Sequence, residues 1–416
     1  MKVLWIVNIV FPEANALLTG KKDLSGGAGW MISLADYLVN KYRVELYIVS
    51  LSSFVSKLEI LKGKGITYYL IPLGKGNRQY NKDYEPFMRE IQDRIKPDVV
   101  HIHGTEFTQG LSYVRACGND HVVVSLQGIK TCIARYYLSG LSFRDIIRNM
   151  TFHDIVKGSV YTEQKAFFKT GLLEQELIRS LNHVIGRTEW DRAQVLTYNS
   201  NISYHFCNEI LRKEFYDGSL WHYDECIPHT IFLSQAWYPL KGAHQVFKAL
   251  PLILNHYPDA QIRIAGTDIT SYSGVYKFVH ESTYGRYMRR LIQQLNITKH
   301  ILFLGNLTSE QMKHEYLRTN VFVCPSSIEN SPNSLGEAQI LGVPHISSYV
   351  GGTPDMMNGN EKGLYRFEEV EMLADKICSI FANKDKQIDM SSIARKRHDP
   401  ETNTNCIYNI YKLISQ

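Results

Sequence analysis

Two glutamates in the C-terminal half of the chain have a spacing and a setting that suit a phosphorylated ligand. Glu329 and Glu337 are separated by seven residues, and Ser331, Pro332 and the polar pair at 333–334 lie between them. Carboxylates accept hydrogen bonds from hydroxyl groups, and the first turn of a helix offers backbone N–H groups to an anion. The pattern predicts a phosphate flanked by two carboxylates, one directed toward a sugar and the other toward a ribose.

The surrounding residues predict a strand that leads into a helix. The apolar run at 321–325 is typical of a buried parallel strand. Ser331 is a favourable N-cap, and Pro332 suits the first helical position because its missing N–H costs nothing there. We expect the helix over residues 333–341, with Gly342 as the glycine that ends it.

This arrangement creates a candidate anion site. The N–H groups of Asn333, Ser334 and Leu335 would point beyond the carboxyl end of a sheet, where anions bind. Glu329 would lie in the loop before the helix and Glu337 inside it, so the two side chains would not share one helical face. A loop acid and an ordinary exposed helix acid form the alternative interpretation, but the strand-to-helix setting favours a binding site.

A longer stretch of sequence carries a family resemblance. The run E-N-S-P-N-S-L-G-E-A at 329–338, followed by G-V-P at 342–344 and G-G-T-P at 351–354, resembles the donor site of retaining glycosyltransferases of family 4. The resemblance implies an α/β fold with two facing Rossmann-like domains (the GT-B architecture) and a deep interdomain cleft. It implies that Glu329 contacts the donor sugar and that Glu337 binds the ribose. The nucleotide-diphosphate sugar is a substrate, and no cofactor or metal is expected.

A second donor-binding element follows the first predicted strand of the C-terminal half. Members of the family usually carry an arginine and then Lys-Gly here, and the arginine and lysine side chains bind the donor diphosphate. Lys241 and Gly242 match the second part, whereas Gln235 stands where the arginine is usual, with one residue more before the lysine. The resemblance assigns Lys241 to catalysis, because an ammonium group stabilises charge that develops on the leaving diphosphate. A surface turn is the alternative interpretation.

The N-terminal half carries further candidates at predicted strand ends. Gly26 and Gly27 lie in a glycine-rich loop after the first strand, which the family places across the cleft from the donor; a plain strand-to-helix turn is the alternative. The acceptor or cleft candidates share positions at the carboxyl ends of later strands, where ligands bind in such sheets. They are His103, Glu106, Gln127 and Arg187.

Composition fits a globular protein with a reducing environment. The chain has 416 residues, 44% of them hydrophobic, and a net charge of +5, which permits an anionic partner but does not demand one. Its seven cysteines are scattered and form no C-x-x-C pair. These features predict a cytoplasmic protein, and the mild positive charge allows peripheral binding on the inner face of the plasma membrane. No Asp-x-Asp motif occurs, and no nucleic-acid-binding signature is visible.

Strand and helix patterns alternate along the chain, which predicts two doubly wound domains. The predicted strands of the first half are 3–11, 43–51, 67–73, 98–103, 122–126 and 183–187, and those of the second half are 230–234, 261–265, 301–304, 321–324, 345–348 and 363–367. We expect an N-terminal acceptor-side domain over 1–215, a nucleotide-sugar-binding domain over 216–400, and a last helix at 401–416 that packs back on the first domain. A basic helical insertion at about 130–180 has an apolar stripe. It predicts either a surface for an acceptor or an anionic membrane, or a helical cap on its own domain.

Together these patterns predict a metal-independent, retaining glycosyltransferase that moves a sugar to a hydroxyl acceptor. The resemblance favours polysaccharide or glycolipid synthesis in a bacterium, with a carbohydrate or lipid-linked acceptor. Two alternatives stay open. One is another enzyme of the same architecture, such as a sugar-nucleotide epimerase or a phosphorylase, and the other is a non-catalytic nucleotide-sugar binding protein.

Overall fold

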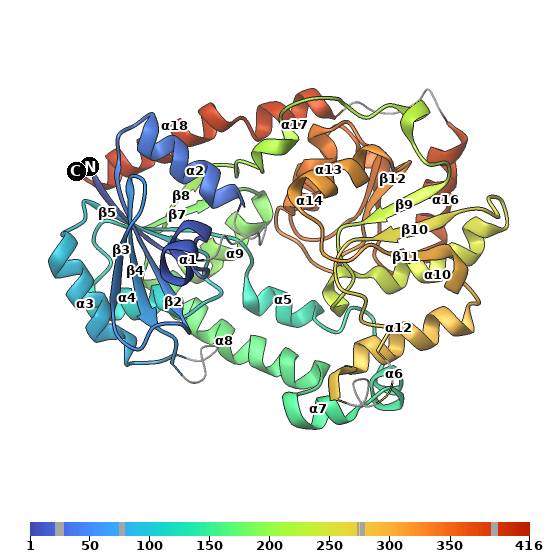
Figure 1. Ribbon diagram of the computed structural model, residues 1–416, viewed down its shortest axis with the longest axis horizontal. Coiled ribbons are helices and arrows are strands. Elements are labelled where there is room, and N and C mark those ends of the chain that lie inside the picture. Colours follow the sequence, from blue (N-terminus) through green and yellow to red (C-terminus); the bar gives the residue numbers. More distant parts are fainter. Residues whose placement is uncertain (21–28, 75–79, 273, 275–278, 384–389) are drawn as a thin grey trace. The chain divides into compact units, whose positions relative to one another are not determined.

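The structure is a computed structural model that describes residues 1–416 except 21–28, 75–79, 273, 275–278 and 384–389. The chain divides into two compact units (Figure 1). The first unit contains residues 1–131, 168–213 and 397–416, and the second contains residues 132–167 and 214–396. Each unit is built on one mainly parallel sheet covered by helices, which confirms the predicted α/β fold class.

The first unit holds an eight-stranded sheet in the order β3-β4-β2-β1-β5-β6-β7-β8, in which only β3 runs antiparallel to its neighbour. Its strands are β1 (Lys2–Ile6), β2 (Glu45–Ser52), β3 (Glu59–Lys62), β4 (Ile66–Pro72), β5 (Val99–His103), β6 (Val122–Ser125), β7 (His183–Gly186) and β8 (Ser203–Phe206). Its helices are α1 (Pro12–Thr19), α2 (Gly29–Asn40), α3 (Tyr84–Ile95), α4 (Gln109–Cys117), α9 (Glu189–Tyr198), α18 (Pro400–Ile414) and most of α8 (Val160–Ser180).

The second unit holds a six-stranded parallel sheet in the order β11-β10-β9-β12-β13-β14. Its strands are β9 (Thr230–Leu233), β10 (Gln261–Ile264), β11 (Ile301–Phe303), β12 (Val321–Cys324), β13 (His345–Ser348) and β14 (Leu364–Tyr365). Its main helices are α5 (Lys130–Tyr136, largely in this unit), α6 (Phe143–Arg148), α7 (Phe152–Lys157), α10 (Ala243–Leu254), α12 (Thr283–Gln294), α13 (Ser309–Leu317), α14 (Asn333–Ile340), α15 (Thr353–Met356), α16 (Val370–Ala382) and α17 (Ser391–Arg397).

The alternation of side chains along the second sheet explains its two helical layers. Ile231 and Leu233 of β9 join a buried cluster with α10, α12 and α16 on one face. Phe232 points to the other face, where its ring centroid lies 5.0 Å from that of Tyr316 in α13. Both faces are covered, and the central strands β9 and β12 are accordingly buried along their whole length and almost entirely apolar, as is typical of a parallel sheet.

The final helix α18 is tied into the core of the first unit by one tyrosine. The hydroxyl of Tyr411 accepts a hydrogen bond from the Trp5 indole at 2.9 Å and lies 2.5 Å from Nδ1 of His101. The other ring nitrogen of His101 lies 2.6 Å from Oγ of Ser125. All these side chains are buried, and burial lowers the pKa of His101 to about 3, so the imidazole is neutral at physiological pH.

The predicted insertion at about 130–180 divides between the units. Residues 132–167 belong to the second unit, whereas residues 168–180 continue α8 in the first. The grouping follows from contacts with α12: Asp154 accepts hydrogen bonds from Thr283 N at 3.1 Å and Thr283 Oγ1 at 2.5 Å. These contacts join positions 129 residues apart, so local sequence pattern could not indicate them.

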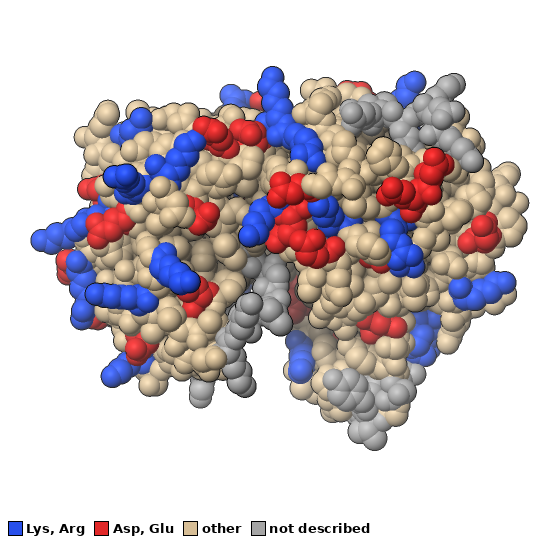
Figure 2. Space-filling model, turned by 45° about the horizontal axis from the view of Figure 1, so that its top comes forward, with Lys and Arg blue, Asp and Glu red and all other residues tan. Residues whose placement is uncertain are grey.

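The surface carries both signs of charge. Lys and Arg side chains are interspersed with Asp and Glu over the face that Figure 2 shows. Within the described residues, no helix has the length and apolar character needed to cross a membrane.

A buried glutamate in α8 stabilises the turn after β6. Glu174 is 2% exposed, and its Oε2 accepts a hydrogen bond from the backbone N–H of Lys130 at 2.7 Å. Its Oε1 lies 2.5 Å from Oγ1 of Thr105. Burial, together with the nearby Glu106, raises the pKa of Glu174 to about 8. A protonated Glu174 can donate to Thr105, whose hydroxyl lies 3.3 Å from the carbonyl oxygen of Gly128.

This raised pKa predicts a pH-dependent stability. Between an unfolded pKa of about 4.3 and the folded value, the folded protein binds a proton that the unfolded chain has lost. The free energy of unfolding therefore falls as pH rises from about 4.3 to about 8. Glu174→Gln preserves the neutral hydrogen-bonding pattern, so we expect it to reduce this loss by roughly 1–3 kcal/mol in urea unfolding.

Glu176→Gln is the matched control, because Glu176 lies in the same helix but is solvent-accessible and paired with Arg115. It should keep the pH profile of the parent. A Glu174→Gln variant whose stability falls with pH as steeply as the parent's would show that Glu174 is ionised in the folded protein.

Candidate functional site

The loop after β9 presents Lys241 at the carboxyl end of the second sheet. The short 3-10 helix Pro239–Lys241 ends at Gly242, which has a φ of +65° and precedes α10. A Cβ atom at Gly242 would lie 1.7 Å from the carbonyl oxygen of Pro325, in the loop after β12. Glycine is therefore required twice over, by its backbone conformation and by the close approach of the second loop.

The loop after β12 brings Glu329 to the same place. Lys241 Nζ donates a hydrogen bond to Glu329 Oε1 at 2.5 Å, and Ser326 Oγ donates to the same oxygen at 2.7 Å. The backbone N–H of Ser327 donates to the carbonyl oxygen of Leu240 at 2.8 Å. The structure thus brings the two predicted catalytic residues together and holds their loops side by side.

The electrostatics of this pair favour a charged lysine. Burial by itself would lower the pKa of Lys241, but the carboxylate of Glu329 and the ring of Tyr238 outweigh it and raise that pKa. The ammonium group also lies 5.8 Å from the centroid of the Tyr238 ring. Lys241 therefore presents a permanent positive charge at the end of the sheet.

A third loop closes around Glu329 from the end of β13. A Cβ atom at Gly351, where φ is +52°, would lie 1.9 Å from the carbonyl oxygen of Glu329, and Gly352 N donates to that oxygen at 3.0 Å. Thr353 Oγ1 donates to Ser348 O at 2.6 Å and so fixes the loop to its own strand. The G-G-T-P segment that the sequence singled out therefore contacts the first glutamate directly.

The helix that carries the second glutamate begins at Asn333, as expected, but its N-cap is one residue later than predicted. Pro332 is the N-cap with extended backbone, and α14 starts at Asn333. The prediction that Ser331 caps the helix was wrong; its hydroxyl donates to Sδ of Met356 at 3.6 Å instead. Leu335 N donates to the carbonyl oxygen of Pro332 at 3.0 Å, so the prediction that this N–H is available to an anion was also wrong.

The N–H groups of Asn333 and Ser334 remain at the open end of α14, with no hydrogen bond to another described residue. Glu337, in the second turn of the helix, is buried with 4% of its surface exposed. Gly342 has a φ of +75° beyond the helix, which confirms its predicted role as the terminating glycine.

Gln235 follows β9 but its side-chain oxygen is already engaged. Trp237 Nε1 donates to Gln235 Oε1 at 3.0 Å, and the Trp237 side chain is exposed. The amide nitrogen of Gln235 therefore remains for a ligand, whereas the charge of the usual arginine is missing from this position.

The candidates of the first unit gather at the carboxyl ends of three neighbouring strands. His103 ends β5 and is buried against Trp5, with ring centroids 4.3 Å apart, and neither of its ring nitrogens has a hydrogen-bond partner among the described residues. Burial, with smaller contributions from His101 and Arg187, holds the pKa of His103 well below its usual value. His103 is therefore a neutral imidazole.

Glu106 and Gln127 lie on either side of the turn at Gly104. Glu106 Oε1 accepts a hydrogen bond from Gly128 N at 2.7 Å, its Oε2 is buried without a partner in the part of the chain that the structure describes, and burial raises the pKa of Glu106. A Cβ at Gly104 would lie 2.5 Å from Glu106 Oε2. The φ of +94° at Gly104 and the closeness of the Glu106 carboxylate both favour glycine in this turn.

Arg187 follows β7 and is 6% exposed. Its guanidinium forms an ion pair with Glu209, and both residues line a small cavity shared with His103, Trp30 and Ser125. The structure thus places Arg187 beside His103, as the sequence predicted for neighbouring strand ends. The predicted glycine-loop residues Gly26 and Gly27 lie outside the described residues.

Sequence reasoning missed three side chains that position the candidates. Ser326 donates to Glu329, Glu209 pairs with Arg187, and Glu174 holds the turn that begins with Gln127. Ser326 adjoins the quoted motif and could have been found by its place after the strand. Glu174 and Glu209 gave no local signal, because their partners are distant in the sequence.

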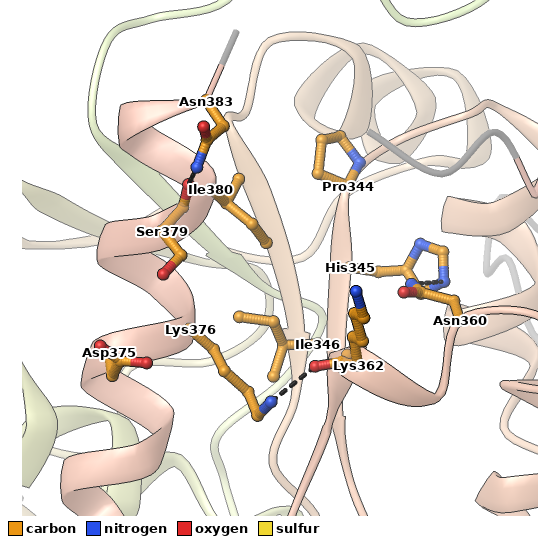
Figure 3. Close-up of a pocket in the computed structure, with 11 residues that line it drawn as sticks. Pro344, His345, Ile346, Asn360, Lys362, Asp375, Lys376, Ser379, Ile380 and Asn383 are labelled. Atoms are coloured by element: carbon orange, nitrogen blue, oxygen red, sulfur yellow. Dashed lines mark hydrogen bonds between the residues drawn. The ribbon is translucent and has the colours of Figure 1, made fainter. Parts of the chain in front are cut away.

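A separate cavity of about 380 Å³ lies elsewhere on the second unit (Figure 3). Its walls come from the start of β13, from residues 360 and 362–363, and from α16, where Lys376 Nζ donates to the carbonyl oxygen of Lys362 at 2.6 Å. Because this cavity adjoins the amino end of β13, it is distinct from the loops at the carboxyl ends that hold Lys241 and Glu329. No group of three metal-binding side chains occurs among the residues that the structure describes.

Comparison with known proteins finds similarity over part of the second unit. Residues 228–397 match the family model described as "Glycosyl transferases group 1". The chain is 24% identical to "Spore coat protein SA" of Bacillus subtilis (strain 168), over 38% of this chain and 40% of that protein. It is 25% identical to "D-inositol 3-phosphate glycosyltransferase" of Corynebacterium urealyticum, over 37% of this chain and 35% of that protein. The matches therefore span only about two fifths of these relatives.

Solved structures resemble the whole chain. "Sucrose-phosphate synthase (tll1590) from Thermosynechococcus elongatus" has a TM-score of 0.70 at 15% identity and covers 99% of this chain and 98% of its own. "Trehalose-6-phosphate from E. coli bound with UDP-2-fluoro glucose" has a TM-score of 0.63 at 11% identity, with 99% of both chains covered. At these identities the likeness establishes the fold, and the chain has two parallel-sheet units of the GT-B type.

Proposed function

We propose that the protein is a retaining glycosyltransferase that moves a sugar from a nucleotide-diphosphate donor to a hydroxyl acceptor. The observation that carries the proposal is the Lys241–Glu329 pair at the carboxyl ends of β9 and β12, beside the open end of α14. The match of residues 228–397 to glycosyl transferases group 1 supports the same reaction class. A structural neighbour bound with UDP-2-fluoro glucose supports the donor class.

The proposed roles follow from the chemistry of each group. Lys241 stabilises charge on the leaving diphosphate, with help from the N–H groups of Asn333 and Ser334. Glu329 accepts hydrogen bonds from the donor sugar, and Glu337 accepts them from the ribose. No protein nucleophile is assigned, so the leaving phosphate oxygen would itself take the proton of the acceptor hydroxyl, and catalysis would rest on positioning and electrostatics.

The proposal extends to the compartment, the pathway and the acceptor of the reaction. We place the protein in the cytoplasm, in polysaccharide or glycolipid synthesis, with a carbohydrate or lipid-linked acceptor and peripheral contact with an anionic membrane. His103, Glu106, Gln127 and Arg187 are the proposed acceptor-side residues.

A screen of donors tests the reaction class directly. The full chain is incubated with uridine, guanosine, thymidine and adenosine diphosphate sugars, and thermal unfolding and release of free nucleoside diphosphate are both measured. A transferase shows stabilisation by one donor and release that depends on an added acceptor. Stabilisation without any release across a broad acceptor panel would indicate a binding protein, and release that requires inorganic phosphate would indicate a phosphorylase.

Replacement of Lys241 tests the proposed charge stabilisation. Lys241→Ala should lower kcat/KM at least about ten-fold, with kcat falling as well as donor affinity, because charge-assisted hydrogen bonds to the diphosphate strengthen in the transition state. In that background, Gln235→Arg should restore part of the activity. Because Lys241→Ala also leaves Glu329 without its ion-pair partner, thermal unfolding of Lys241→Ala and of Lys241→Ala/Glu329→Gln measures the cost of the uncompensated charge separately from the kinetics.

Lys376→Ala provides a matched lysine control at the other end of the sheet and should keep parental kinetics. An active Lys241→Ala variant would mean that the diphosphate charge is stabilised elsewhere.

Replacement of Glu337 separates nucleotide binding from transfer. Glu337→Gln keeps the size of the buried side chain but removes its charge, and should weaken nucleoside diphosphate binding by roughly 1–3 kcal/mol through weaker ribose hydrogen bonds. Isothermal titration calorimetry measures the change, with Glu281→Gln as a control for loss of a buried carboxylate in the same unit. Unchanged affinity in Glu337→Gln would exclude the ribose contact.

The stereochemistry and metal requirement of the reaction provide a further prediction. The product should keep the anomeric configuration of the donor, as seen by NMR, and activity should survive EDTA because Lys241 and α14 can hold the diphosphate. An inverted product would contradict the retaining assignment. Loss of activity on chelation, restored by manganese or magnesium, would contradict metal independence.

A further inference from the structure

Six large apolar side chains point outward from two consecutive short helices of the second unit. They are between 41% and 75% exposed and lie on α6, on α7 and in the connection between them: Phe143, Ile147, Met150, Phe152, Ile155 and Val156. We call them the α6–α7 face, and Figure 1 shows both helices beside α12. Spacings of three and four residues place the members within each helix on one side.

We propose that the α6–α7 face docks the protein onto the surface of an anionic lipid membrane. The inference is independent of the transfer reaction and names the surface that peripheral contact would use. A cluster of this size is unusual on a soluble face, where large apolar side chains are normally scattered singly. Their outward positions would allow them to enter the boundary between headgroups and acyl chains.

The two helices are held rigidly with these side chains outward. Ser142 and Asp145 form a capping box on α6, and Thr151 and Asp154 form another on α7. The inward side chain Ile146 is buried in the core of the second unit. The apolar exposure therefore does not come from a loose segment, because each helix has its own cap and a buried anchor.

Side chains of α12 fix the helices from behind. Arg286 donates to the carbonyl oxygen of Met150 at 2.7 Å, and Arg290 donates to that of Arg148 at 2.9 Å. Thr283 donates twice to the buried carboxylate of Asp154. These bonds satisfy the polar groups on the inner side, so the outer side can stay apolar without cost to the backbone.

The charges around the face identify the partner. Arg144, Arg148 and Lys157 are exposed on the same segment, whereas none of the acidic residues in the fully described stretch 141–160 is exposed. Asp145 is engaged in its capping box, and Asp154 is buried. Basic side chains beside an apolar surface match anionic headgroups above an acyl layer.

The same charges disfavour a second copy of this chain as the partner. In a two-fold interface the same patch meets itself, so the arginines of both copies would come close together. Like charges at an interface oppose association, whereas anionic lipids neutralise them. An acidic protein would match the charge as well, and the experiment below separates it from a membrane.

Vesicle binding tests the proposal with the full chain. Phosphatidylcholine vesicles with and without phosphatidylglycerol are mixed with the protein and sedimented, at low and high salt. The parent should bind the vesicles that contain phosphatidylglycerol, and Phe143→Ser/Ile155→Ser should reduce the partition coefficient at least about ten-fold. Arg144→Gln/Arg148→Gln should reduce binding to the anionic vesicles and its dependence on salt.

Phe54→Ser/Leu220→Ser is the matched control, because it removes two exposed apolar side chains that lie outside the face. It should bind as the parent does, and thermal unfolding should show that all three variants are folded. The proposal would be overturned if the parent failed to bind anionic vesicles. It would also be overturned if the Phe143→Ser/Ile155→Ser variant bound them as well as the control does. A parent dimer in solution that this variant dissociates would assign the face to self-association instead.

Discussion

The ion pair between Lys241 and Glu329 is the interaction on which the candidate site depends. Either charge alone would destabilise the fold in a site this enclosed, because a buried ion loses its hydration. The pair therefore couples the loop after β9 to the loop after β12, and neither can move far alone. An ammonium group has three donors, so the bond to Glu329 leaves others for an incoming anion. A site organised before the ligand arrives needs little rearrangement during the reaction.

The backbone around this pair interlocks by close contact. Carbonyl oxygens of Pro325 and Glu329 occupy the places where Cβ atoms of Gly242 and Gly351 would stand. Both glycines also have left-handed backbone, which other residues adopt at a cost. The Lys-Gly and G-G-T-P segments are far apart in the chain, yet each is shaped by a carbonyl of the segment that lies between them. Gly242 and Gly351 allow the three loops to pack closely, and this close packing positions Lys241 and Glu329.

Local pattern was sufficient for all strands of the second sheet and insufficient for the two edge strands of the first. The six strands of the second sheet were predicted because short apolar or alternating runs lie between polar turns there. The edge strands β3 and β8 were missed, since they are only partly buried and lack such a run. The strand β12 and the terminating glycine Gly342 were correctly predicted, whereas the roles of the two glutamates stay predictions. The cap at Pro332 and the support from Glu174 were not predicted, because both depend on contacts with distant residues.

The path of the chain through the two units has a consequence for how the molecule can be divided. The chain passes from one unit to the other after residues 131, 167, 213 and 396, and α8 itself continues from the second unit into the first. Neither unit is a contiguous piece of sequence. A fragment that ends at 213 would lack α18, whose Tyr411 fills the core beside Trp5, and would carry residues 132–167 without α12 beneath them. The gene therefore has no single cut that yields either unit intact, and a crossover between residues 132 and 396 would leave the first unit assembled from both parents.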